Sequence, residues 1–431
     1  MSELIIPAEA PDLNQLSERR IDRIARRTIL TLLKRLDHGQ LTLVEGGQRH
    51  LYGKMTDLSP LQAAITVAHP QLYTRIFLGG SIGAAEAYMD GLWSADDLTS
   101  VMRILALNQH AFEELEKGVA RLMVPLYKFY HYVRKNTRSG SRKNILAHYD
   151  LGNDFYSLLL DETMTYSCGI FEREDSTLKQ ASEAKYDRIC KKLQLAAGDE
   201  VLEIGTGWGG FALHAAQNYG VRVTTTTISE QQHDFAQKRI ASAGLNDRIM
   251  LLKKDYRDLS GKFDKLVSIE MIEAVGHHFY DKFFNTCGRL LKDDGLMALQ
   301  AITIGDQIFD RHKRSVDFIK RYIFPGSCIP SITAISNAIA RATDLQLVHL
   351  EDITPHYART LREWRRRFFS NIAKVRNLGF SDTFIRMWEY YLCYCEGGFT
   401  ERYINDVQMV FAKPMCRKIS LRDIQPGGSN T

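Results

Sequence analysis

Residues 199–209 read DEVLEIGTGWG, and this short segment restricts the fold more than any other part of the chain. A run of β-branched and aliphatic residues, Val201 to Ile204, leads into Gly205, Gly207 and Gly209, and a helical pattern follows. Glycines at a strand-to-helix turn adopt conformations that other residues avoid, and they let a ligand approach the backbone closely. The segment therefore predicts an α/β domain with a ligand at the end of its first strand.

The spacing of these glycines distinguishes between two kinds of ligand. It is GxGxG, with Glu203 two positions before the first glycine, rather than the GxGxxG of dinucleotide sites. No acidic residue ends the next strand pattern, 221–227, where a dinucleotide site holds its ribose. A site for S-adenosylmethionine has no pyrophosphate to seat on a helix N-terminus, so the pattern favours this ligand. From this segment alone, a tight turn in an unrelated α/β domain remains the alternative.

Further strand patterns alternate with helical patterns downstream of the glycine turn. They are VRVTTTT (221–227), RIMLL (248–252), FDKLVSIE (263–270) and GLMALQAITI (295–304). This alternation predicts an α/β fold with a doubly wound, Rossmann-like sheet. Together with the S-adenosylmethionine site that the glycine spacing favours, it corresponds to the fold of class I methyltransferases. Ligands of such sheets lie at the carboxyl ends of the strands. We therefore expect the polar residues near these ends to converge on one crevice: Glu203, Thr227, Gln232, Asp255, Glu270, Glu273 and Gln300.

A change of composition near residue 140 predicts a domain boundary. The stretch NTRSGSRKN (136–144) has the most linker-like composition in the chain. We expect residues 1–140 to form a mainly helical N-terminal domain and residues 141–431 to form the methyltransferase domain. One hairpin is predicted in the N-terminal part, since LTLVE and RHLYGK flank Gly46 and Gly47.

Basic residues are concentrated in three windows, although the chain has a formal net charge of only +5. These windows are residues 17–35, 121–144 and 359–376. In the first window, Ile21, Ile24 and Leu32 have helix-like spacing, which continues to Leu36 just after it. The second window contains five aromatic residues, including a histidine, and no acidic residue. Such segments bind anionic membrane surfaces or nucleic acid, while a solvated helix face is the plain alternative.

The remaining features of the sequence predict a cytoplasmic protein. No run of 18 apolar residues occurs, and the N-terminus has no basic and apolar export signal. Seven cysteines are scattered along the chain, which indicates reduced thiols. Cys393 and Cys395 are closer together than the usual metal or redox spacing, so no metal site is predicted.

Eight segments, taken in order, resemble the cyclopropane-fatty-acyl-phospholipid synthases and the related mycolic acid cyclopropane synthases over residues 140–415. They are HYDLGNDFYSLLLDETMTYSCGIF (148–171), VLEIGTGWGG (201–210), TISEQQ (227–232), DYRDL (255–259), EMIEAVG (270–276), YIFPGSCIPS (322–331), PHYARTLREW (355–364) and YYLCYCEGGF (390–399). GGSIGAAEAYMDGLW (79–93) also resembles the N-terminal domain of the bacterial synthases. EMIEAVG, TLREWRRRF and MWEYY look more like the plant-type branch of the family.

The resemblance implies two sets of site residues. The methyl donor, S-adenosylmethionine, would be held by Tyr166, Ser167, Glu203, Gly205, Gly207, Gly209, Thr227, Ser229, Gln232, Asp255 and Tyr256. A bicarbonate ion acting as general base would be held by Cys168, Glu273, Gln300, Ile302 and Tyr357. Cys395 matches a cysteine often described as catalytic, but the chemistry needs no thiol nucleophile, so we expect it to line a pocket wall.

The implied reaction adds a methylene to the cis double bond of an unsaturated phospholipid acyl chain in a bilayer. Methyl transfer leaves a carbocation, which an aromatic-lined, water-excluding tunnel formed by helical insertions would stabilise. Ring closure then needs a base, and the sequence alone reveals no Asp or Glu aimed at the donor methyl. The bicarbonate ion that the resemblance implies would act as this base. The N-terminal 140 residues are expected to dock on an anionic membrane surface or to form a homodimer, leaving the enzyme peripherally associated with the membrane.

One departure from the family keeps alternatives open. Gln300 stands where the best-known members have His, and Gln can donate a hydrogen bond but cannot take up a proton. The product could therefore be a methyl-branched or methylene-bearing chain without a ring. A non-catalytic lipid-binding protein is a second alternative. A nucleic-acid methyltransferase is disfavoured, because IEMIEAVG stands where the Pro-rich catalytic tetrapeptide would follow the fourth strand.

Overall fold

The computed structural model describes residues 20–112, 151–417 and 419, which form two compact units. Of these residues, the N-terminal unit contains 20–112, 316–318 and 379–401. The catalytic unit contains the rest. The predicted boundary at residue 140 and the second basic window lie outside the described residues.

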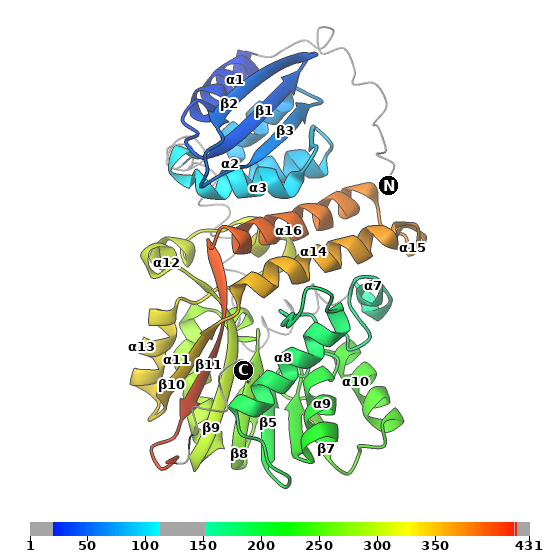
Figure 1. Ribbon diagram of the computed structural model, residues 1–431, viewed down its shortest axis with the longest axis vertical. Coiled ribbons are helices and arrows are strands. Elements are labelled where there is room, and N and C mark those ends of the chain that lie inside the picture. The colour runs from blue at the N-terminus through cyan, green and yellow to red at the C-terminus, as the bar shows by residue number, and fades with distance from the viewer. Residues whose placement is uncertain (1–19, 113–150, 418, 420–431) are drawn as a thin grey trace, which may run out of the picture. The chain divides into compact units, whose positions relative to one another are not determined.

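The N-terminal unit combines helices with a four-stranded sheet of order β2-β1-β3-β4 (Figure 1). Its elements are α1 (Arg20–Leu33), β1 (Gly39–Glu45), β2 (Gln48–Lys54), β3 (Gln62–Val67), α2 (Gln71–Met89), β4 (Trp93–Ala95) and α3 (Leu98–Leu107). The predicted hairpin is confirmed, because β1 and β2 are antiparallel and turn at Gly46 and Gly47, both at positive φ. The unit is less helical than expected, since the Ala-containing run of β3 pairs with β1 despite a sequence that also suits a helix.

Helix α16 (Asp382–Thr400) completes this unit from far along the chain. The Tyr88 hydroxyl donates to Glu389 at 2.7 Å, and Arg103 pairs with Glu401 at 2.6 Å. A side chain at Gly397 would meet Met102 at 2.8 Å, so glycine lets α16 lie close to α3. The predicted methyltransferase domain, residues 141–431, includes this helix, whereas the contacts of the helix group it with the N-terminal unit.

The catalytic unit is built on a seven-stranded sheet of order β10-β11-β9-β8-β5-β6-β7 (Figure 1). The strands are β5 (Glu200–Ile204), β6 (Arg222–Thr226), β7 (Ile249–Leu252), β8 (Phe263–Ile269), β9 (Leu291–Ile304), β10 (Gln346–Asp352) and β11 (Ile404–Ala412). The five predicted strands, β5 to β9, are all present and parallel. The sequence did not predict β10 or β11, and β11 is antiparallel to β9. The strand order reverses between β5 and β8, which is where such sheets bind ligands.

Helices cover both faces of this sheet. Leu202 and Leu266 share one core with α11 (Tyr280–Leu290) and α13 (Ile332–Ala342). Val201 and Val267 share the other with α8 (Leu178–Lys192), α9 (Gly210–Tyr219) and α10 (Glu230–Ser242). Neighbouring residues of a strand thus point to opposite cores, which explains the continuous apolar runs in the sequence. Within the described ranges, no helix is both long and apolar enough to cross a membrane.

Candidate active site

The glycine turn after β5 leaves open space beside the backbone. Gly205, Gly207 and Gly209 have φ values of +108°, +53° and +86°, a region that other residues rarely adopt. A Cβ atom built on Gly207 meets nothing within 4 Å, whereas one on Gly205 would touch the Met271 side chain at 3.3 Å. The turn can therefore receive a ligand against its backbone, and it fits the predicted S-adenosylmethionine site.

Glu203 is buried directly before this turn. Thr225 on the neighbouring strand β6 donates to its carboxylate at 2.6 Å, and the Thr225 and Thr206 hydroxyls lie 2.6 Å apart. Burial raises the pKa of Glu203 to about 8, because the charged form loses its hydration. A cationic ligand such as a sulfonium or an ammonium at this turn would favour the ionised carboxylate.

The predicted adenosine residues occupy the ends of β6 and β7. Thr227 donates to the Gln232 side chain at 2.9 Å, and Ser229 is the N-cap residue of α10. Asp255 forms a two-point ion pair with Arg257, with bonds of 2.8 and 2.5 Å. All lie at the carboxyl edge of the sheet, where the sequence expected them. The Tyr256 ring packs edge-on against Phe283 with centroids 5.5 Å apart.

The TYSC segment is supported by a lysine that the sequence did not indicate. Lys185 of α8 is fully buried and donates to the Ser167 hydroxyl at 2.7 Å. Burial lowers the pKa of Lys185 to about 8, although neighbouring carboxylates oppose the change. Lys185 thus brings a cationic group to the buried site. Nothing in its helical sequence context distinguishes it from a surface lysine.

Glu270, directly after β8, is the centre of the buried site. Its Oε1 accepts from the Cys168 backbone N–H at 2.8 Å and from Gln300 Nε2 at 2.7 Å. Its Oε2 accepts from the Tyr357 hydroxyl at 2.6 Å. Tyr357 comes from α14 (Thr354–Ser370), so the three donors lie on three separate parts of the chain. Burial raises the pKa of the Cys168 thiol, and this thiol donates to the Gly169 carbonyl at 3.2 Å. The backbone N–H is therefore the Cys168 group that contacts Glu270.

Glu273 and Ile302, the other two residues expected to hold bicarbonate, contact each other rather than Glu270. The Ile302 backbone N–H donates to Glu273 Oε1 at 2.6 Å, while Glu273 Oε2 is buried without a hydrogen-bond partner. Burial and the nearby charge of Glu270 raise the pKa of Glu273 to about 8. The donors expected to hold bicarbonate, on Cys168, Gln300, Ile302 and Tyr357, therefore already contact carboxylates of the protein, and only Glu273 Oε2 is left without a partner. Because three of these donors are occupied by Glu270, the arrangement does not fit the ion.

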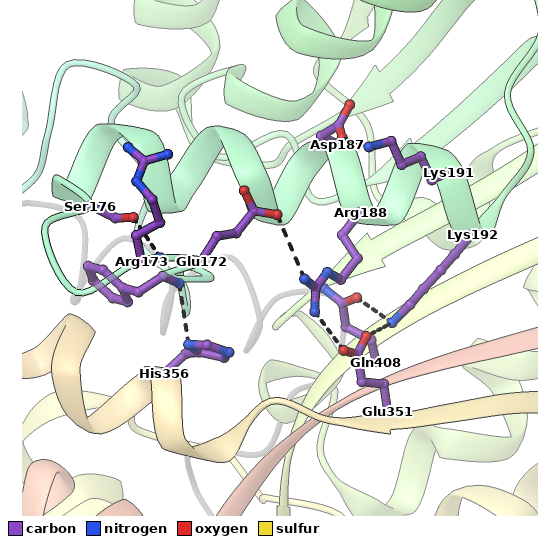
Figure 2. Close-up of polar contacts among 11 residues, drawn as sticks. Glu172, Arg173, Ser176, Asp187, Arg188, Lys191, Lys192, Glu351, His356 and Gln408 are labelled. Atoms are coloured by element: carbon purple, nitrogen blue, oxygen red, sulfur yellow. Dashed lines mark hydrogen bonds and ion pairs between the residues drawn. The ribbon is translucent and has the colours of Figure 1, made fainter. Parts of the chain in front are cut away.

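A second layer of polar residues orients Gln300. Gln408 on β11 donates to Gln300 Oε1 at 3.0 Å and accepts from Lys192 Nζ at 2.7 Å. Figure 2 shows Lys192 between Gln408 and Glu351, with Arg188 on the same Glu351 carboxylate at 2.6 Å. A lysine ammonium can only donate, so it decides which end of the Gln408 amide faces it. This order in turn presents the Gln300 N–H group to Glu270.

Asp406 is a further residue of the cluster that the sequence did not indicate. It lies on β11, fully buried, and its Oδ2 accepts from Gln300 Nε2 at 3.2 Å. Burial and the charges of Glu270 and Glu273 raise its pKa well above the ordinary range. Its position on an unpredicted strand explains why the sequence did not indicate it.

An aromatic cluster adjoins these carboxylates. Tyr166 packs against Trp364 and Tyr156 with ring centroids 5.1 and 5.3 Å apart. Trp364 in turn lies edge-on to Tyr357 at 6.3 Å. Cys395 lies on α16 in the N-terminal unit, where burial raises the pKa of its thiol.

Comparison with known proteins agrees with this geometry. Residues 136–409 match the family model described as mycolic acid cyclopropane synthetase. The chain is 39% identical over 364 residues to the cyclopropane-fatty-acyl-phospholipid synthase of Escherichia coli K12, covering 81% of this chain and 88% of that protein. It is 38% identical over 344 residues to the tuberculostearic acid methyltransferase UfaA1 of Mycobacterium tuberculosis, covering 78% and 80% of the two proteins.

Solved structures give the same result. The mycolic acid cyclopropane synthase CmaA1, complexed with SAH and CTAB, is 34% identical with a TM-score of 0.59. The cyclopropane synthase MmaA2 of M. tuberculosis is 32% identical with a TM-score of 0.59. Each match covers 63% of this chain and 98% of the other. The chain therefore belongs to the cyclopropane synthase family of S-adenosylmethionine-dependent methyltransferases.

Proposed function

We propose that this enzyme transfers a methylene from S-adenosylmethionine to the cis double bond of an unsaturated phospholipid acyl chain, forming a cyclopropane ring. The observation that carries the proposal is the link from Glu270 through Tyr357 and Trp364 to Tyr166. It joins a buried carboxylate to a cluster of aromatic rings at the carboxyl edge of the sheet. The name of the E. coli relative supports the phospholipid substrate.

The chemistry requires both halves of this arrangement. The sulfonium of S-adenosylmethionine supplies an electrophilic methyl group, and the alkene attacks it to leave a carbocation on the acyl chain. Ring faces such as those of Tyr166 and Trp364 stabilise a cation without reacting with it. A base must then remove a proton from the added methyl group before the ring can close. The donors expected to hold bicarbonate are engaged within the protein, so that ion is not assigned this role.

A methyltransferase that stops short of the ring is the second candidate. One relative is named tuberculostearic acid methyltransferase rather than cyclopropane synthase, and it is nearly as similar as the E. coli enzyme. Gln300 also cannot accept a proton in the way that a histidine could. The same active site would then release a methyl-branched or methylene-bearing acyl chain.

The first basic window suits reversible docking on an anionic membrane. Ile21 and Ile24 of α1 are 41% and 60% exposed, and the acidic Asp22 between them is turned inward and accepts a bond from Thr74. The outward surface consequently holds apolar and basic residues together: Arg20, Ile21, Arg23, Ile24 and Arg27. Such a mixture binds anionic lipid headgroups while inserting apolar side chains. We propose that α1 brings the enzyme to its bilayer substrate.

Product identification tests the proposed function. The full chain is incubated with vesicles of a cis-monounsaturated phospholipid and methyl-labelled S-adenosylmethionine, and the recovered acyl chains are analysed by NMR and mass spectrometry. We expect label in cyclopropyl methylene protons. Label in a branched methyl or exocyclic methylene group, without cyclopropyl protons, would favour the second candidate. Donor binding without label in any lipid would instead support a non-catalytic lipid-binding protein.

A further inference from the structure

The group held by the polar cage is a carboxylate of the chain itself. Cys168 N, Gln300 Nε2 and the Tyr357 hydroxyl donate to Glu270 over 2.8, 2.7 and 2.6 Å. These are three of the five groups expected to surround a bicarbonate ion. Resting on the proposed function, we propose that the Glu270 carboxylate stands in place of bicarbonate and is the base that removes the proton for ring closure.

The charges around Glu270 support this role. Burial and neighbouring charge raise the pKa values of Glu273 and Asp406, so both carboxyl groups retain protons more readily than usual. Three donors converge on the Glu270 carboxylate, which therefore has the most hydrogen-bond donors of the three carboxyl groups. The buried Lys185 is a cationic group near the Glu270 carboxylate.

The backbone conformation of Glu270 also supports this role. Its φ is +47°, a left-handed conformation that glycine adopts freely and that costs energy for a residue with a Cβ atom. The backbone N–H donates to the carbonyl of Gln300 at 2.8 Å, which holds the conformation in place. Strain of this kind persists where the surrounding structure enforces it, often at functional sites. The chain thus has a glutamate side chain at position 270, where a glycine would relieve the backbone strain.

Glu270 is next in the chain to a residue that contacts the donor turn. It follows β8 directly, and the side chain of the next residue, Met271, faces Gly205 of the donor turn. Of the three bonds from the cage, two fall on Oε1 and one on Oε2. The Asp406 carboxyl group also hydrogen-bonds to the Glu270 side chain, so the proposed base lies between the three cage donors and a second carboxyl group.

The electrons balance in the proposed step. The alkene π pair forms a bond to the donor methyl, the carbon–sulfur bond breaks onto sulfur, and the neighbouring alkene carbon becomes cationic. Glu270 takes a proton from the added methyl group, and the released carbon–hydrogen pair forms the second carbon–carbon bond of the ring. The products are a cyclopropane, S-adenosylhomocysteine and a protonated Glu270, which then loses its proton to solvent.

The test compares two variants with the wild type, with and without bicarbonate. Buffers are purged of carbon dioxide, and ring formation is followed by mass spectrometry before and after bicarbonate is added. Glu270→Gln keeps the shape but cannot accept the proton. Glu270→Gly removes the carboxylate, relieves the positive φ and opens space between the three donors. S-adenosylmethionine binding by calorimetry and the thermal midpoint show that each variant is folded.

We expect wild-type ring formation to be independent of bicarbonate. Both variants should be slower by about 10²–10⁴-fold, the range typical of losing a general base. Bicarbonate should then restore Glu270→Gly at least tenfold and leave Glu270→Gln unchanged. A wild-type rate that collapses without bicarbonate would overturn the proposal, even if neither variant folded. So would a Glu270→Gln variant that closes the ring at the wild-type rate.

Failure of the proposed function would look different. In that case the wild type would transfer no label to any unsaturated phospholipid, or only form a branched methyl group, in both buffers. An enzyme that makes the ring only with bicarbonate retains the proposed function and loses only the role of Glu270.

Discussion

Gln408 donates its side-chain amide to Gln300 over 3.0 Å, and this bond determines which end of Gln300 faces Glu270. We predict that Gln408→Leu lowers ring formation by roughly 3–10-fold, because a freed amide can turn its oxygen toward the carboxylate. The KM for S-adenosylmethionine should stay unchanged, since only a positioning contact is lost. The unfolding free energy should also fall by about 1–3 kcal/mol, because buried polar groups lose their partner.

Steady-state kinetics and urea unfolding measure both effects. Arg222→Ala is the matched control, since Arg222 forms an exposed ion pair with Glu200 elsewhere in the same sheet. Exposed pairs contribute at most about 1 kcal/mol. An equal loss of ring formation in both variants would contradict a positioning role for Gln408.

Tyr357→Phe removes the donor to Glu270 Oε2 while keeping the ring beside Trp364. A hydrogen bond to a charged group contributes about 1.5–3 kcal/mol, so we expect ring formation to slow by roughly 10–100-fold. Donor affinity, measured by calorimetry, should not change. Tyr219→Phe is the control, because it removes a similar bond to Asp187 outside the cluster. A wild-type rate in Tyr357→Phe would show that the hydroxyl has no part in the reaction.

Gly207→Ala and Gly244→Ala form a matched pair. Both glycines have positive φ, +53° and +67°, and a Cβ atom on either meets nothing within 4 Å. Each substitution should therefore cost roughly 1–2 kcal/mol of stability from the left-handed conformation alone. Only Gly207→Ala should weaken S-adenosylmethionine binding, by at least about tenfold, because its methyl group fills the space beside the donor turn. Equal donor affinities in the two variants would remove the turn from the donor site.

Glu203 makes the unfolding free energy depend on pH. Its pKa is raised from 4.5 to about 8 in the folded state, so the folded protein keeps a proton that the unfolded chain has lost. Stability should therefore fall as pH rises between about 5 and 8, with a slope of about 1.4 kcal/mol per pH unit from this group. Glu203→Gln should remove that part of the slope in urea unfolding at pH 5.5, 6.5 and 7.5. Glu174→Gln, at an exposed site, controls for the loss of a carboxylate. An unaltered slope in Glu203→Gln would mean that this carboxyl group does not titrate as described.

Exposed residues of α1 should control membrane binding. We expect the double variant Ile21→Ser/Ile24→Ser to bind anionic vesicles at least about tenfold more weakly, since it loses two apolar side chains from the contact surface. Wild-type binding should also weaken as salt rises, because exposed charges are screened. Leu51→Ser, at a 62% exposed site on β2, tests whether any apolar loss has the same effect. Vesicle co-sedimentation that is insensitive to salt and to both α1 substitutions would exclude α1 as the docking helix.

Much of the catalytic unit was predictable from local pattern. The glycine turn and the five parallel strands follow from short apolar runs and glycine spacing, which local conformation determines. The resemblance singled out Cys168, Gln300 and Tyr357, and polar groups of these three residues contact one carboxylate, that of Glu270. The β1–β2 hairpin likewise followed from its two central glycines.

The centre of the site was not predictable in the same way. Glu270 was expected only to face the crevice, since no local pattern shows that donors from residues 168 and 357 will meet its carboxylate. Asp406 and Gln408 depend on β11, an antiparallel strand added after a helical segment. Lys185 has an ordinary helical context, and burial alone gives it significance. These roles arise from packing between distant segments, which single-sequence periodicity does not contain.

The origin of α16 has a consequence for biosynthesis. Residues 382–400 supply a helix to a unit whose other elements lie mostly between residues 20 and 107. A ribosome therefore releases the first helices and strands of that unit long before their last partner has been translated. The intervening catalytic sheet must be made in the meantime, so the unit that begins the chain is among the last parts to be completed. A fragment ending at residue 140 would lack this helix however long it was given to fold.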